Sequence, residues 1–404
     1  MPTMTPPATD LPQALASARE RVGFTQDDVA ALIGQQRPVI SMWESGEREP
    51  NSHQLSKLSA IYRIPLDELL GAEERPRVEF EQLLFRDAGD RLDARGKAEI
   101  QGYLGFLDDY AGFLDALGEE PGLMEPPFHL SRGFTTREDI RRKAQDARAL
   151  FGLGTGPVGD LLSLADRIGI TVYLAPLGDD LKRTVSGAFV PHGGVGFSIL
   201  INAETTPGRR QFTFAHELGH ALFHGDALYV DYFGRREAGE RFANAFAAEF
   251  LVPAQSLRSA VEAFGEVRIR DPETVVHLQR YFGVSYLTML VRLGAAGLAD
   301  APDIERMRQV APVRLAESLG YSTEPDEWMQ SPRRWGLARF PRRFLRLLRR
   351  AFDAERITLS GASAMTGVAQ EEIEAFLSYR VPPSDTEPSN QTEEFEFLSE
   401  SARP

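Results

Sequence analysis

Apolar residues recur at helical spacing along most of this chain, and only one short part alternates as strands do. The helical pattern covers residues 11–71, 77–118, 136–150, 157–168, 237–250, 255–300 and 301–380. The stretches 170–174, 186–190 and 196–201 are rich in β-branched and aromatic residues and predict three strands. We therefore predict a mainly α, multidomain fold: a five-helix N-terminal domain, an α+β domain with a small antiparallel sheet, and a helical C-terminal region.

Composition narrows the class of protein. The chain contains no cysteine, which excludes disulfides, cysteine-based zinc fingers and thiol nucleophiles. No apolar run reaches the roughly 18 residues that a membrane helix needs. The first residues also lack the basic and apolar regions of a signal peptide. We predict a cytoplasmic protein with no membrane partner.

The most informative motif is His216-Glu217-Leu218-Gly219-His220, within an apolar helical run. Histidines four residues apart share one helix face, so both imidazoles can reach one metal ion. Glu217 would lie beside that ion, where it can take a proton from an activated water. This is the zincin pattern H-E-x-x-H. The alternative is a buried helix with two core histidines.

A catalytic zinc ion normally has three protein ligands, so one more is needed. The metzincin spacing fails, because Phe223 and Asp226 occupy its glycine and histidine positions. His224 lies about 12 Å further along the helix, too far to share the ion. The remaining route is a carboxylate from the next helix.

Three glutamates on that helix compete for the ligand position. Glu240 is the preferred candidate, with Glu237 and Glu249 as rivals. Asn244, one turn after Glu240, can orient a histidine ligand. For the oxyanion, the candidates are Tyr229, Tyr232 and His224. A substrate strand could pair with a sheet edge such as segment 196–201.

The run from Arg209 to His224, followed by the segment from Glu240 to Pro253, resembles the ImmA/IrrE family of zinc metallopeptidases. The resemblance covers roughly residues 140–260. It implies a Zn²⁺ site, with Mn²⁺ as the alternative in the cell, whose ligands are His216, His220 and Glu240 and whose general base is Glu217. In this family the helix that carries the glutamate usually ends with Leu-Leu-Met-Pro, whereas here the four residues that end at Pro253 are Phe-Leu-Val-Pro.

Residues 11–71 resemble the repressor-type (XRE) helix-turn-helix family. The match rests on the segment from Thr25 to Gly34 and on the segment from Gln35 to Gly46. Thr25 and Asp28 can form a capping box, and Gly34 suits the turn before a helix that begins near Gln36. By position, the DNA-contacting residues would be Gln26 on phosphate and Gln36, Arg37 and Ser41 on bases.

Two features of this domain depart from a strong DNA-binding pattern. Pro38 and Met42 occupy positions where polar base-reading side chains often lie. The domain holds six basic and eight acidic residues, a net charge of −2, so it would neutralise few phosphates. The alternative is a helical module of the same fold that contacts protein.

Nine arginines lie between Arg333 and Arg356. They indicate either a second nucleic-acid contact, aided by the helix-turn-helix-like stretch 357–373, or a basic face that packs on the acidic body. The second interpretation is favoured.

The predicted organisation has five parts: 11–71, the helix-turn-helix domain; 77–130, a helical linker; 136–300, the metallopeptidase domain; 301–380, a helical region; and 381–404, a disordered acidic tail. The resemblances imply a DNA-binding regulator that binds a double-stranded operator. A homodimer is one form in which it would do so. Its zinc-dependent endopeptidase domain would cleave a regulatory protein, such as a repressor, in stress or mobile-element control. The alternatives are a regulator whose zinc domain senses or binds a partner without proteolysis, and autocleavage near residues 72–80.

Overall fold

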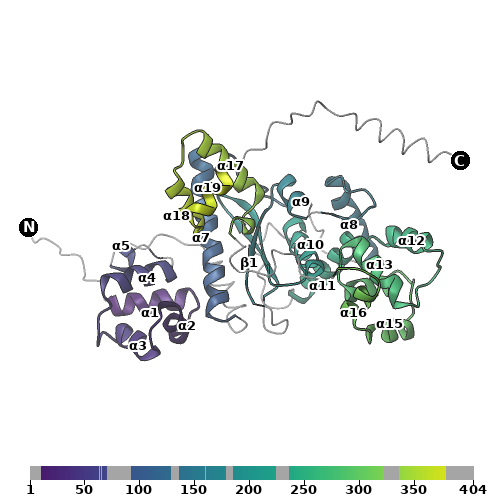
Figure 1. Cartoon of the computed structure of the whole chain (residues 1–404), viewed down its shortest axis with the longest axis horizontal. Helices are drawn as coiled ribbons and strands as arrows, with labels where there is room; N and C mark the ends of the chain where they lie inside the picture. Colours follow the sequence, from purple (N-terminus) through teal and green to yellow (C-terminus); the bar gives the residue numbers. More distant parts are fainter. Residues whose placement is uncertain are drawn as a thin grey trace, which may run out of the picture. The chain divides into compact units, whose positions relative to one another are not determined.

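The computed structural model describes residues 11–62, 64, 66–70, 92–128, 136–159, 161–178, 185–223, 236–322 and 336–378. The chain forms two compact units, one ending at Leu348 and one beginning at Arg349. As predicted, the fold is mainly helical with one small sheet (Figure 1). The domain boundaries predicted from the sequence stay predictions, and the tail 381–404 lies outside the described residues.

The first five helices of the chain surround one apolar core. They are α1 (Leu11–Arg21), α2 (Gln26–Ile33), α3 (Arg37–Ser45), α4 (Ser52–Tyr62) and α5 (Leu66–Leu69). The predicted capping box starts α2, since Thr25 Oγ1 accepts the Asp28 N–H at 3.1 Å. Gly34 ends α2 in the left-handed conformation, with φ of 71°. Ile40 and Trp43 then bury one face of α3 in the core, which leaves its other face to solvent.

The sheet has the order β1-β3-β2, with β1 (Thr171–Ala175), β2 (Gly187–His192) and β3 (Gly196–Asn202). β2 and β3 are antiparallel as predicted, whereas β1 lies parallel to β3, so the sheet is mixed. β3 is buried at every position because it lies in the centre. The prediction that segment 196–201 offers an edge to a substrate strand is therefore wrong, and the edges belong to β1 and β2.

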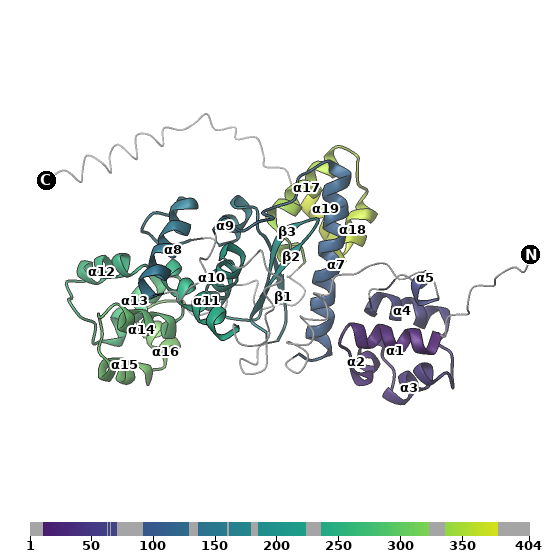
Figure 2. The ribbon, with the colours of Figure 1, turned by 180° about the vertical axis from the view of Figure 1, so that it is seen from behind.

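Helices cover both faces of the sheet (Figures 1 and 2). On one face lies α7 (Ala94–Leu117), whose Tyr103 ring is centred 5.3 Å from that of Tyr173 and shares a 2.7 Å hydrogen bond with Ser198. On the other face, α10 (Pro207–Phe223) packs on β2 and β3, and α11 (Arg236–Leu251) packs on α10. The predicted metal-binding helix is thus an inner helix, held between the sheet and α11.

The described ranges contain seven further helices of the first unit that precede Leu337. They are α8 (Arg137–Leu150), α9 (Leu161–Arg167), α12 (Ala254–Ala263), α13 (Pro272–Phe282), α14 (Tyr286–Ala295), α15 (Ala301–Arg308) and α16 (Pro312–Ser318). α8 packs on α11, while α14 contacts α11, α13 and α15. Within the described ranges, no helix combines the length and the apolar character that crossing a bilayer requires.

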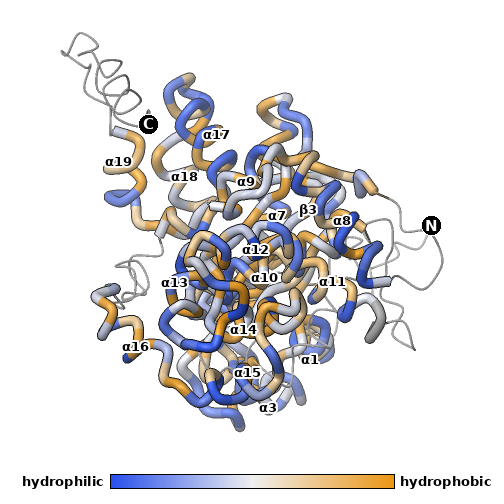
Figure 3. The backbone as a smooth tube through the Cα atoms, turned by 90° about the vertical axis from the view of Figure 1, so that its right-hand side faces the viewer, coloured by the Kyte–Doolittle hydropathy of each residue, from blue (hydrophilic) through white to orange (hydrophobic). Residues whose placement is uncertain are grey.

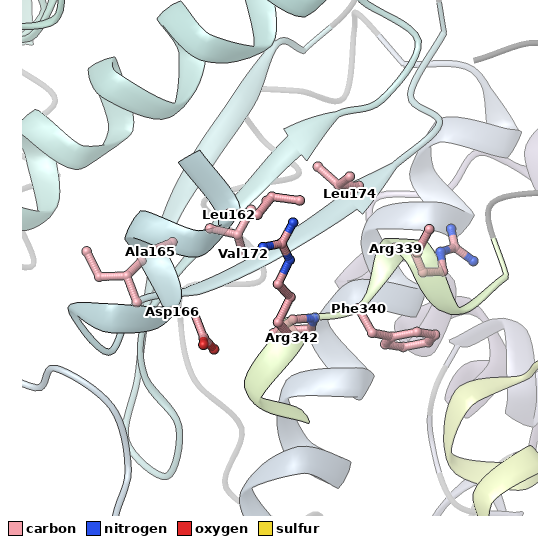
Figure 4. A pocket seen from close by; sticks show the side chains of 11 residues that line it. Leu162, Ala165, Asp166, Val172, Leu174, Arg339, Phe340 and Arg342 are labelled. Carbon is pink, nitrogen blue, oxygen red and sulfur yellow. The ribbon is translucent and has the colours of Figure 1, made fainter. Parts of the chain in front are cut away.

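A segment near the end of the first unit covers the outer side of β1. The short helix η3 (Leu337–Arg339) contacts β1, and the Phe340 ring is centred 5.5 Å from the ring of Tyr173. A pocket between α9, β1 and this segment is lined by Val172 and Leu174, with Asp166 and Arg342 beside it (Figure 4). Because this segment lies along β1, that edge of the sheet is not free.

The arginine-rich helix α17 (Arg342–Asp353) begins in the first unit, and hydrophilic and hydrophobic residues alternate along it (Figure 3). Phe344 and Leu348 are fully buried. Three arginines of η3 and α17 pair with carboxylates of the same unit: Arg339 with Glu99, Arg343 with Glu119, and Arg346 with Asp166. These ion pairs favour the interpretation that the basic face packs on the acidic body.

The second unit contains α18 (Leu359–Thr366) and α19 (Gln370–Ser378). Gly367 joins them in the left-handed conformation, with φ of 65°, as the helix-turn-helix-like sequence predicts. The exposed side of α19 carries Glu371, Glu372 and Glu374. Such a face repels phosphate, so this side of α19 is not suited to nucleic acid.

Gly122 should be required for the packing of the sheet. Its N–H donates to Val195 O at 2.8 Å, and a Cβ at this position would lie 2.1 Å from Gly169 O. We predict that Gly122→Ala lowers the free energy of unfolding by about 1–3 kcal/mol or more, because two backbone segments must separate. Gly112→Ala, on α7 with open space around it, should instead raise it by about 1 kcal/mol. Urea denaturation checks both, and equal stabilities would contradict the close packing.

Candidate metal centre

Two imidazoles project from the same face of α10. His216 and His220 have ring centroids 4.9 Å apart and Nε2 atoms 3.2 Å apart. Their side chains are 14% and 20% exposed, so both rings lie mostly below the surface but can be reached. The opposite face of the helix is anchored by Phe214, Leu218 and Leu222, all fully buried. This amphipathic burial determines the direction in which both rings point.

α11 approaches α10 closely at a glycine. A Cβ on Gly219 would lie 3.0 Å from Phe246 Cδ1 and 3.5 Å from Ala243 Cα. One turn before Ala243, Glu240 places Oε2 3.2 Å from His216 Nε2 and Oε1 3.6 Å from His220 Nε2. Small residues at the helix contact therefore bring a distant carboxylate to the two imidazoles.

The three donor groups lie close enough to share one divalent metal. Bonds of about 2.0–2.1 Å at tetrahedral angles put neighbouring ligand atoms roughly 3.3 Å apart. The two Nε2 atoms are 3.2 Å apart, Glu240 approaches His216 with Oε2 and His220 with Oε1, and a set with one ligand atom from each residue lies within 4.8 Å. Two imidazoles and one carboxylate are a donor set of catalytic zinc that leaves one position for water.

The structure separates Glu240 from its rival Glu249. The Glu249 side chain is buried, pairs with Arg292 at 2.5 Å and accepts the Ala254 N–H at 2.9 Å. These contacts join the end of α11 to α12 and α14, so Glu249 has a structural task. The side chain of Glu237 lies outside the described residues.

Glu217 is buried between α10 and β2. Ser186 O accepts the Asn202 N–H, so by the antiparallel alternation Phe189 turns its N–H away from β3. That N–H donates to the Glu217 carboxylate. Gly187 permits the approach, since a Cβ there would lie 2.4 Å from Thr213 Cγ2. The predicted base is thus held by the strand beside it, a contact that the motif does not reveal.

The charges of the site influence one another. Burial raises the pKa of Glu217, although the two histidines oppose this shift. Burial acts to lower the pKa of His216, but Glu240, Glu217 and the Asn244 side chain outweigh it and raise that pKa. Hydrogen bonds from both histidines hold the pKa of Glu240 well below its usual range. The cluster stabilises a cationic group beside Glu240, which is the position that a metal dication would take.

Asn244 lies one turn after Glu240 on α11, and its side chain hydrogen-bonds to His216. This is the contact that the predicted orienting role requires. His224, Tyr229 and Tyr232, the candidates for oxyanion stabilisation, lie outside the described residues and stay predictions.

The predicted DNA-contacting residues differ in their exposure to solvent. Gln36, Arg37 and Ser41 are exposed at the start of α3. Gln26 is half-buried, and its Nε2 donates to Glu44 Oε2 at 2.9 Å. Arg19 Nε also donates to Glu44, at 2.7 Å. The Gln26 amide nitrogen is therefore already engaged within the domain, a partnership that the sequence pattern did not reveal.

Fold and site together define a helix-turn-helix module joined to a metallopeptidase-type domain. Residues 165–294 match the model of the IrrE N-terminal-like domain, and residues 15–69 match the helix-turn-helix model. The chain thus combines an XRE-type helix-turn-helix DNA-binding domain with an ImmA/IrrE-type metallopeptidase domain. That peptidase family implies a divalent metal.

Relatives match each part separately. The radiation response metalloprotease IrrE of Deinococcus deserti is 34% identical over 133 residues, which are 31% of this chain and 44% of that protein. IrrE of Deinococcus radiodurans is 36% identical over 104 residues, 24% of this chain and 29% of that protein. The HTH-type transcriptional regulator ImmR of Bacillus subtilis is 34% identical over 64 residues, 16% of this chain and 50% of that protein. The matched part of this chain spans less than half the length of each IrrE relative, and it spans half the length of ImmR.

Substitution of the two α11 glutamates should separate metal binding from stability. Glu240→Gln should abolish stoichiometric zinc binding and leave the fold intact, because its side chain is half-exposed. Glu249→Gln should keep the zinc but cost about 3–5 kcal/mol of stability, because Arg292 would stay buried without its carboxylate.

Elemental analysis of the purified proteins and thermal unfolding measure the two effects. Zinc retained by Glu240→Gln and lost by Glu249→Gln would show that the ligand assignment is wrong.

Proposed function

We propose that this protein is a cytoplasmic DNA-binding regulator whose zinc-dependent endopeptidase domain cleaves a specific regulatory protein, a repressor of the helix-turn-helix class. The observation that carries this proposal is the convergence of His216, His220 and Glu240 beside the buried carboxylate of Glu217. The similarity of the peptidase domain to IrrE and of the N-terminal domain to ImmR supports it.

The proposed reaction is hydrolysis of a peptide bond. His216, His220 and Glu240 would hold Zn²⁺, or Mn²⁺ in the cell, and the bound ion would supply Lewis-acid activation of water and of the scissile carbonyl. Glu217 accepts the proton of the attacking water and delivers it to the leaving amine. Its burial suits this task, because a desolvated carboxylate holds a proton more readily. Asn244 orients His216 through their hydrogen bond.

We propose that the substrate binds as an extended strand along β2. β3 is central, and the η3 segment lies along β1, so β2 is the edge that remains. The outward-facing backbone groups of β2 are those of Gly187, Phe189 and Pro191, but the Phe189 N–H is taken by Glu217 and Pro191 has none. An added strand would therefore accept from the Gly187 N–H and donate to the outward carbonyls, with its peptide bonds next to the metal ligands. Main-chain pairing is indifferent to sequence, so the choice of substrate would depend on additional contacts.

The helix-turn-helix domain would supply the second half of the function. In our proposal α3 enters the major groove of an operator, with Gln36, Arg37 and Ser41 at base edges. Repressors of this class bind operators as dimers, so we also propose that the protein acts as a homodimer on DNA. Binding at the operator would bring the peptidase to the place where its repressor substrate is concentrated.

Replacement of the base should separate metal binding from catalysis. Glu217→Gln should keep zinc at the wild-type level and lower the cleavage rate of a repressor by roughly 10²- to 10⁴-fold, because it cannot accept the proton. The measurement incubates the zinc-loaded protein with purified repressors from neighbouring genes and identifies the products by mass spectrometry.

His216→Ala serves as the metal-free control and should lose both zinc and cleavage. A cut that Glu217→Gln retains would remove Glu217 from this role. If no repressor is cut but an operator duplex is shifted, the endopeptidase proposal fails in favour of a sensing or partner-binding domain. A cut in the protein's own chain near residues 72–80 would identify autocleavage instead.

A further inference from the structure

One basic residue stands alone in the two helices of the DNA-binding motif. The sequences of α2 and α3 contain a single arginine or lysine, Arg37, at the first position of α3. Its Nε lies 3.6 Å from Asp27 Oδ2, across the turn that joins the helices. The two side chains are 63% and 74% exposed, so both can be reached from solvent. The sole cation of the motif is therefore paired with a carboxylate on the same surface.

Within α2 and α3 no other side chain carries a positive charge. Pro38, which follows Arg37, has no N–H to offer a phosphate. The first turn of α2 carries Asp27 and Asp28, of which Asp28 pairs with the buried Lys97 at 2.7 Å and Asp27 faces Arg37. Arg37 is therefore the cation of these two helices that DNA can reach.

We propose that Asp27 sets the sequence selectivity of this domain by holding the Arg37 guanidinium until a matching base replaces the carboxylate. The proposal rests on the DNA binding proposed above. A guanine presents two acceptors, O6 and N7, to an arginine in the major groove, and it can take over the role of the carboxylate. A lone phosphate can also accept from Arg37, but it would lie close to the negative charge of Asp27.

Selectivity is a difference between two affinities, and Asp27 acts on them unequally. On a matching site, breaking an exposed ion pair costs little and a bidentate contact to a neutral base is gained. On a non-matching site the same small cost is paid, and the phosphate that accepts from Arg37 is in addition repelled by the nearby carboxylate. Asp27 thus weakens non-specific binding more than specific binding, in a domain whose net charge of −2 already limits non-specific attraction.

The test compares two DNA probes with the full-length, zinc-loaded protein. One probe is a duplex selected by this protein from a random pool, and the other is the unselected pool. Fluorescence anisotropy over a series of salt concentrations measures the affinity of Asp27→Asn, Arg37→Ala and the double variant. Glu20→Gln, which removes one exposed charge from α1, is the matched control, and Asp27→Glu tests whether a carboxylate suffices.

Asp27→Asn should bind the unselected pool roughly 2- to 5-fold more tightly than wild type. Its salt dependence should steepen by about one counterion, because Arg37 becomes free for phosphate. Affinity for the selected duplex should change less, so the preference falls. Arg37→Ala should weaken binding to the selected duplex roughly 5- to 150-fold and lose the preference for one guanine. In the Arg37→Ala background, Asp27→Asn should have a smaller effect than it has in the presence of Arg37, and Glu20→Gln and Asp27→Glu should resemble wild type.

Three results would overturn this inference. If Asp27→Asn has no effect on binding to the pool, Asp27 does not restrain Arg37. If Asp27→Asn has the same effect with and without Arg37, the carboxylate acts as a general charge and not through the pair. If the wild-type protein selects no duplex at all, the proposed DNA binding itself fails, and the role of Asp27 falls with it.

Discussion

The packing of α11 on α10 is the contact on which the candidate site depends. Gly219 and Ala243 let the two helices approach until Phe246 touches the glycine, and this distance brings Glu240 to the imidazoles. A larger side chain at 219 would push α11 outward and move the carboxylate away from both rings. The far end of α11 is held by the buried pair of Glu249 with Arg292. The position of α11 relative to α10, and not the His-Glu-x-x-His motif alone, brings the three metal-donor side chains together.

The two edges of the sheet have different neighbours, and only one of them lies beside the candidate site. One edge is β1, which the η3 segment and Phe340 contact. The other edge is β2, which lies against α10 and donates a backbone N–H to Glu217. Exposed edges are places where another strand can add. In this fold the β2 edge, along which we propose that the substrate binds, lies next to the carboxylate that would move the proton.

Positive charge is distributed unevenly in this acidic protein. Arg339, Arg343 and Arg346 are matched with carboxylates of the body, so their charge serves packing. In the helix-turn-helix domain, Arg19 is engaged by Glu44 and Arg37 by Asp27. With six basic and eight acidic residues, a net charge of −2, this domain is poorly suited to coating DNA.

The sequence by itself determined the elements and the local chemistry. Helical spacing, the capping box of Thr25 with Asp28 and the left-handed Gly34 are short-range features, so they could be predicted correctly. The pair of histidines one turn apart is equally local. What the sequence could not determine were relations between segments distant along the chain. It preferred Glu240 as the ligand but could not exclude Glu249, assigned the substrate edge to a strand that proved central, and gave no sign that Phe189 holds Glu217. Those relations depend on strand order and on the distance between packed helices, and only the tertiary structure decides them, because burial and close packing act between residues far apart in sequence.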